Sequence, residues 1–266
     1  MTTEMNGSRG SDDGASTTRR TFLVGAAAAG GALALGGLPA LGAADAEATT
    51  FTVRIENIAD QTGTTLDPSG DVSGVPVVLS PGAFAVHSNG EPMFTSGEPE
   101  RNNGLEEVAE DGDPTRLIEA LGADDRVAQA GAFTTPEGAM GPGPLTPGNA
   151  YEFEIQARPP AQYLSLVTMF VQSNDLFYAL GGAGGFDLFD GSDPASGDVT
   201  SAVGLWDAGT EVNEEPGAGE NQAPRQGGPG VGLVERGTVA PIEEVNGYDY
   251  PPVEGVLSVT LTPSQM

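Results

Sequence analysis

The sequence contains no cysteine and no lysine, and it has a single histidine, His87, among 266 residues. Without cysteine the chain can form no disulfide, no thiolate nucleophile and no cysteine-ligated metal site. One histidine likewise excludes a metal site built from several imidazoles. Any metal that this chain binds must therefore be held mainly by oxygen atoms.

Positive charge is also scarce. All ten basic residues are arginines, they face 38 acidic residues, and the formal net charge is −28. Nucleic-acid binding requires clustered cations against phosphates, so this imbalance argues against it, and docking onto anionic lipid is disfavoured for the same reason. An acidic surface without lysine is expected of a protein that stays soluble in molar salt. We infer a halophilic origin.

Residues 1–46 have the pattern of an export signal. The first sixteen residues are polar and without periodicity, which predicts disorder. The pair Arg19-Arg20 then precedes an Ala/Gly/Leu-rich run that ends at Leu41, the order found in twin-arginine signal peptides. The run is too rich in glycine to make a good membrane span.

Small residues around position 45 supply plausible cleavage sites. We therefore expect a secreted or cell-surface protein, exported by the twin-arginine pathway, with no membrane span in the mature chain. Residues 47–266 form the exported domain and carry nearly all of the acidity.

The exported part predicts an all-β fold. Its 40 glycines and 21 prolines, counted over the whole chain, favour turns over long helices. Helical spacing of apolar residues occurs over 105–110 and 115–121, the second preceded by Asp113-Pro114 as a start signal. Alternating or continuous apolar segments typical of strands lie at 51–58, 75–80, 83–87, 151–157, 163–171, 185–189, 202–206 and 256–261. Many short strands with a short helical insertion predict a two-sheet antiparallel β-sandwich.

Three acidic residues stand at strands or strand ends in apolar surroundings: Glu154, Asp175 and Asp207. Neighbouring strand ends lie close together in a sandwich, and buried like charges that converge there need a cation. With oxygen ligands alone, the cation would be Ca²⁺ before Mg²⁺. The alternative is that these residues are three more solvated acids.

Two other acidic groups are interpreted as solvated. The aspartates between 187 and 198 do not fit the spacing of a calcium-binding EF-hand loop. The acids at 106, 107, 110 and 111 are expected on the wet face of a helix.

Three motifs carry a family resemblance: Gln172–Phe177 (QSNDLF), Phe186–Gly191 (FDLFDG) and Asp207–Glu211 (DAGTE). Together they resemble the spondin domain, the N-terminal module of F-spondin and mindin, which also occurs in secreted microbial proteins. The resemblance extends over residues 50–262. It departs from the animal domains at Phe189, which stands where a cysteine would lie, and at Leu176, which replaces the usual tryptophan.

The resemblance implies a C2-like β-sandwich that binds calcium and serves adhesion or recognition outside the cell. It places the metal ligands on Glu154, Asp175 and Asp207, with Glu152 as the rival of Glu154 and Glu211 as an accessory or simply solvated acid. The partner would be an extracellular protein or glycan.

The sequence is also compatible with two other functions. A secreted hydrolase could use a pair of carboxylates, and a structural role at the cell envelope would share the same fold. Serine-hydrolase chemistry is disfavoured because no G-x-S-x-G motif is present and His87 follows an apolar strand, where a structural role is expected. We expect a binding module that is not an enzyme.

Overall fold

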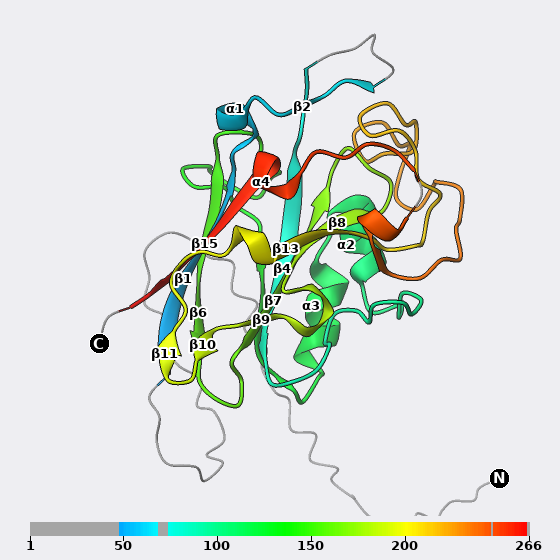
Figure 1. The fold of residues 1–266 in the computed structure, drawn as a ribbon. Helices are drawn as coiled ribbons and strands as arrows, with labels where there is room; N and C mark the ends of the chain where they lie inside the picture. Colours follow the sequence, from blue (N-terminus) through cyan, green and yellow to red (C-terminus); the bar gives the residue numbers. More distant parts are fainter. Residues whose placement is uncertain (1–47, 69–73, 246, 265–266) are drawn as a thin grey trace, which may run out of the picture.

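The chain folds into two antiparallel sheets that pack face to face, and two helices cover the outer face of the larger sheet (Figure 1). A computed structural model describes residues 48–68, 74–245 and 247–264. The export signal interpreted at residues 1–46 lies outside the described residues. The smaller sheet has the order β12 (Gly197–Asp198), β15 (Leu257–Pro263), β1 (Thr49–Asn57) and β6 (Ala150–Ala157).

The larger sheet has seven strands. Six follow the order β14 (Ala240–Pro241), β13 (Val203–Asp207), β8 (Leu176–Leu180), β7 (Tyr163–Phe170), β4 (Leu79–His87) and β5 (Val127–Phe133). The seventh, β9 (Phe186–Asp187), pairs with β7. Two small separate pairs complete the strands: β2 (Thr65–Leu66) with β3 (Val75–Pro76), and β10 (Phe189–Asp190) with β11 (Asp193–Pro194).

The helices are short. The α-helices are α1 (Ala59–Thr62), α2 (Leu105–Asp111), α3 (Thr115–Gly122) and α4 (Val253–Val256). The 3₁₀ turns that lie wholly within the described residues are η2 (Gly182–Gly184), η3 (Thr200–Ala202) and η4 (Ile242–Glu244). No helix within the described residues is long and apolar enough to cross a membrane.

The main core lies between the two sheets. Strands β1 and β6 alternate buried and more exposed residues, because successive side chains of a strand point to opposite faces. Their inward aromatic residues meet those of the larger sheet: Phe153 stacks on Phe84 at 4.6 Å and on Phe133 at 5.3 Å between ring centroids. The alternation in the sequence therefore corresponds to a sandwich with one wet face.

A second core lies between the larger sheet and helices α2 and α3. Leu105 and Val108 of α2, together with Leu117 of α3, are fully buried against residues of this sheet such as Phe177. The predicted start signal of the second helix acts as expected, since Asp113 Oδ1 accepts a hydrogen bond from the Thr115 backbone N–H at 2.9 Å. Strands with both faces covered are predominantly apolar and show no alternation, as the nearly continuous apolar run in β7 shows.

These observations confirm the predicted fold class, a two-sheet antiparallel β-sandwich with a short helical insertion. One predicted strand, 75–80, is divided: Val75–Pro76 belongs to the small pair with β2, whereas β4 starts at Leu79. Strand β4 continues through Pro81 and Gly82, which separate the two predicted segments 75–80 and 83–87. An irregularity in register between Leu79 and Gly82 accommodates the proline. Strands β5 and β8 lie outside the predicted segments.

Candidate metal centre

Asp175 and Asp207 lie side by side at the ends of neighbouring antiparallel strands. Asp175 immediately precedes β8, and Asp207 is the last residue of β13, where it pairs with Leu176. The Ala208 backbone N–H donates to the Asp175 carbonyl oxygen at 3.1 Å, which holds the two chain segments together. Both side chains are buried, with exposed fractions of 0% and 2%. The structure therefore brings these two predicted residues together.

The two oxygens of the Asp175 carboxylate have different surroundings. Oδ2 accepts three hydrogen bonds from the DAGTE segment: from the Thr210 N–H at 2.8 Å, the Thr210 hydroxyl at 3.2 Å and the Glu211 N–H at 3.0 Å. Oδ1 is buried and has no hydrogen-bond partner. A buried carboxylate oxygen without a partner is costly, so Oδ1 is a natural position for a proton or a cation.

The Asp207 carboxylate has two partners. Its Oδ1 accepts from the Gly209 backbone N–H at 2.6 Å, and Asn213 donates from its side-chain amide to Oδ2. Burial raises the pKa of Asp207, and burial together with the neighbouring charge of Asp207 raises the pKa of Asp175. The charge of Asp207 disfavours the ionised form of Asp175, and a bound cation would reverse this effect.

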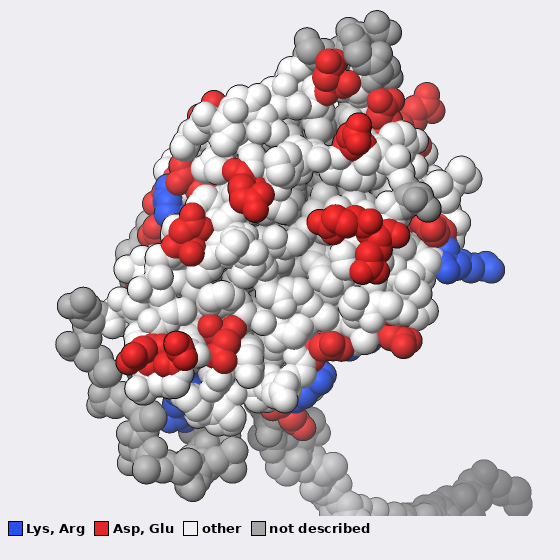
Figure 2. Space-filling view, viewed as in Figure 1, with Lys and Arg blue, Asp and Glu red and all other residues white. Residues whose placement is uncertain are grey.

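No arginine of the described residues neutralises the charge of this pair. The ion pairs of the described residues involve Arg54, Arg116 and Arg126, none of which contacts Asp175 or Asp207. Figure 2 shows acidic side chains spread over the visible face, with basic side chains only near its margins. The buried pair is thus part of a strongly acidic molecule, and no arginine of the described residues forms an ion pair with it.

Glu154 is not part of this pair. It lies in β6 of the smaller sheet, on the face that turns away from the main core, and its side chain is exposed. It is paired in register with Thr52 of β1, whereas Asp175 and Asp207 belong to the larger sheet. Its rival Glu152 has the same outward orientation and lies 3.6 Å from Arg54. The strand alternation that buries Phe153 necessarily turns both glutamates outward.

Two further acids, Glu110 and Glu211, are buried beside the pair, each with an exposed fraction of 4%. Glu211 Oε1 accepts from the Gly232 N–H at 2.7 Å, and burial raises its pKa. Glu110 belongs to α2, and burial raises its pKa to about 8, with further contributions from the charges of Glu211, Glu106 and Asp175. The prediction that the 106–111 acids form a wet helix face is therefore wrong for Glu110.

A long loop that follows the DAGTE segment closes over this region (Figure 1, orange, beside α2 and β8). An antiparallel contact forms its base: the Val212 N–H donates to the Leu233 carbonyl at 2.7 Å, and the Glu235 N–H to the Thr210 carbonyl at 2.8 Å. The loop is also tied to α2, because Gln226 donates to Asp111 Oδ1 at 2.8 Å. This covering loop explains why acids of α2 are removed from water.

The donor set of the pair fits a hard cation. Within the described residues, no group of three or more Asp, Glu, His or Cys side chains is arranged to hold a metal ion. An ion at Asp175 and Asp207 would therefore complete its coordination with neutral oxygens, as calcium commonly does with backbone carbonyls, amides and water. The partnerless Asp175 Oδ1 is the observation in favour of this fit.

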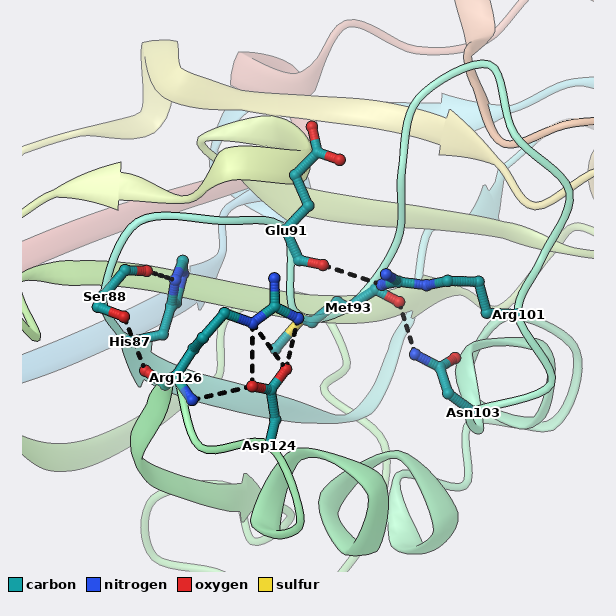
Figure 3. Close-up of polar contacts among 8 residues, drawn as sticks. All are labelled: His87, Ser88, Glu91, Met93, Arg101, Asn103, Asp124 and Arg126. Atoms are coloured by element: carbon teal, nitrogen blue, oxygen red, sulfur yellow. Dashed lines mark hydrogen bonds and ion pairs between the residues drawn. The ribbon is translucent and has the colours of Figure 1, made fainter.

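His87 shows no catalytic arrangement. Its Nδ1 lies 2.6 Å from the Ser88 carbonyl and its Nε2 lies 2.9 Å from the Ser165 hydroxyl, and the side chain is completely buried. Burial lowers its pKa, which keeps the ring neutral. Figure 3 shows that Asp124, the nearby acid, points to Arg126 instead of the imidazole. The prediction of a structural histidine agrees with this geometry.

Neither a family model nor a curated protein matches this chain. The chemical role of Asp175 and Asp207 therefore follows from the geometry described above.

Proposed function

We propose that this protein is a secreted, calcium-binding adhesion or recognition module without catalytic activity, whose ion is held by Asp175 and Asp207. The observation that carries the proposal is the pair of buried carboxylates at adjacent strand ends, with Asp175 Oδ1 unpartnered and no arginine of the described residues paired to either group. The resemblance of the QSNDLF and DAGTE segments to the spondin domain supports calcium as the ion and an extracellular protein or glycan as the partner.

A binding role also agrees with the inaccessibility of the candidate catalytic groups. A carboxylate pair that hydrolyses a glycoside must contact the sugar, whereas Asp175 and Asp207 are at most 2% exposed. His87 and Ser165 are likewise buried and engaged with each other. These carboxylates are better placed to bind an ion than to contact a substrate.

Calcium titration in molar KCl, after removal of metal with a chelator, tests the proposal. At an ion concentration of about 100 Kd, linkage predicts about 2.7 kcal/mol of stabilisation, which corresponds to a rise in Tm of roughly 5–10 °C for a domain of this size. The single tryptophan, Trp206, precedes Asp207 and provides a fluorescence signal for binding.

Asp207→Asn should abolish this rise in Tm, because it removes one of the two charged ligands. Glu154→Gln is the matched control, and we expect it to bind calcium like the wild type because Glu154 faces solvent on the other sheet. Absence of calcium binding by the wild type would refute the proposal. Loss of binding in Glu154→Gln would instead restore the ligand set that the family resemblance implies. Retention of the protein on intact cells, with calcium and with chelator, tests adhesion separately.

A further inference from the structure

The main chain of the DAGTE segment holds one oxygen of each carboxylate in the pair. Asp175 Oδ2 accepts from the N–H groups of Thr210 and Glu211. Asp207 Oδ1 accepts from the N–H group of Gly209. These backbone donors fix the orientation of both carboxylates. The other two oxygens are Asp175 Oδ1, which is buried and unpartnered, and Asp207 Oδ2.

The side-chain amide of Asn213 is the group that meets Asp207 Oδ2. An ionised carboxylate can only accept hydrogen bonds, so the amide presents its NH2 group to this oxygen. The Asn213 side chain is half-buried, and no described residue donates a hydrogen bond to its carbonyl oxygen Oδ1. Asn213 therefore combines a direct contact with the carboxylate pair and an oxygen that other described residues do not engage.

The backbone on both sides of Asn213 is held in place. The Val212 N–H donates to the Leu233 carbonyl at 2.7 Å, and the Glu214 N–H donates to Asn174 Oδ1 at 3.0 Å. Rotation about the side-chain bonds of Asn213 can thus exchange its amide nitrogen and oxygen without movement of the main chain. Asn174 lacks this freedom, because the hydrogen bond from Glu214 fixes its carbonyl oxygen.

We propose that Asn213 is a further ligand of the cation site, and that its amide rotates to present the carbonyl oxygen to an ion on Asp207 Oδ2. The inference rests on the proposed calcium binding. Two carboxylates already balance the charge of a divalent ion, so the next ligand should be neutral, and amide oxygens are common calcium ligands. The NH2 group offers only donors, which a cation repels. Binding through Asn213 would also link the base of the covering loop to the ends of β8 and β13.

Two replacements of Asn213 distinguish an oxygen ligand from a hydrogen-bond donor. Asn213→Asp keeps the shape and replaces the NH2 group by an oxygen. In chelator its Tm should fall below the wild-type value, because a third carboxylate then faces Asp207. Its calcium affinity should equal or exceed that of the wild type, because the added charge strengthens the ligand set. Asn213→Leu removes the oxygen at similar size, and calcium affinity should fall by about tenfold or more, since even outer partners of a metal site contribute that much.

The same two replacements at Asn221 are the matched controls. Asn221 lies in the covering loop and also donates from its side-chain amide to a carboxylate, Glu214 Oε1 at 2.8 Å. Both Asn221 variants should bind calcium with wild-type affinity, measured by titration of the Trp206 fluorescence and by the rise in Tm.

The outcomes separate this inference from the proposed function. Wild-type affinity in Asn213→Leu, combined with loss of binding in Asp207→Asn, would overturn the role of Asn213 and leave the calcium site in place. Weaker binding in Asn213→Asp would also overturn it, because the amide would then serve only as a donor to Asp207. Equal losses of affinity in the Asn213 and Asn221 variants would overturn it as a general effect on the loop. If the wild type binds no calcium, both proposals are wrong.

Discussion

Glu110 gives the sharpest test of the buried acidic region. It is 4% exposed in α2, and burial raises its pKa from 4.5 to about 8. The folded protein therefore holds a proton on Glu110 at neutral pH that the unfolded chain releases. Because the folded state binds more protons, stability falls as the pH rises from about 4.5 to about 8, and Glu110 adds no pH dependence outside this window.

The size of the effect follows from the two pKa values. A rise from 4.5 to about 8 corresponds to about 5 kcal/mol, and we expect about 2–4 kcal/mol in practice, because local relaxation and entry of water reduce such penalties. Glu110→Gln keeps the shape of the neutral acid and cannot ionise. The variant should match the wild type near pH 5 and exceed its stability by that amount near pH 9.

Urea unfolding at a series of pH values, in molar KCl with chelator, measures this difference. The chelator removes any contribution of calcium, and the salt screens exposed charges much more than buried ones. Glu119→Gln on the exposed face of α3 is the control, and its stability should follow the wild type at every pH. If Glu110→Gln also follows the wild type across the range, Glu110 is not a buried neutral acid, and the packing of the covering loop on α2 is wrong.

Two substitutions test the packing of the fold. Gly104→Ala should destabilise the protein by about 3 kcal/mol or more in chemical denaturation, because Gly104 has φ +107° and a Cβ there would lie 2.2 Å from the Leu117 nitrogen. The control Gly63→Ala, at φ +70° with open space around it, should cost only about 1 kcal/mol, and equal losses would contradict the helix packing. Ser165→Ala should cost about 1–3 kcal/mol by leaving His87 Nε2 without its partner, and an unchanged Tm would argue against that hydrogen bond.

The sequence carried enough information for the fold class because the alternation in β1 and β6 has one dry face and one wet face. Strand β8 was not predicted from the sequence. Both of its faces are covered, one by the main core and the other by α2, so its residues show no alternation. The longer run of β7 also lacks alternation but was long enough to predict a strand, whereas a continuous apolar run of only five residues cannot be distinguished from a buried helix segment by periodicity. The separation of segments 75–80 and 83–87 at Pro81 was wrong for a different reason. The register irregularity that accommodates this proline within β4 depends on the neighbouring strand.

The candidate site was predictable in part. Asp175 and Asp207 each stand at a strand end, and antiparallel pairing of β8 with β13 brings such positions together. Glu154 is a mid-strand residue between two buried neighbours, so alternation alone could have placed it outward. The burial of Glu110 was not predictable, because the loop that covers it lies about a hundred residues later in the chain.

The antiparallel contact at the base of the covering loop has a consequence for how this protein can diversify. The contact between residues 210–212 and 233–235 anchors both ends of the loop, and the backbone N–H groups of Thr210 and Glu211 hold Asp175. Main-chain donors make few demands on side-chain identity, and doubling the length of a closed loop costs only about 0.6 kcal/mol. The tip of the loop is therefore free to change in length and composition while the carboxylates keep their geometry. Chains that differ only in this loop can therefore present different surfaces above the same pair of carboxylates.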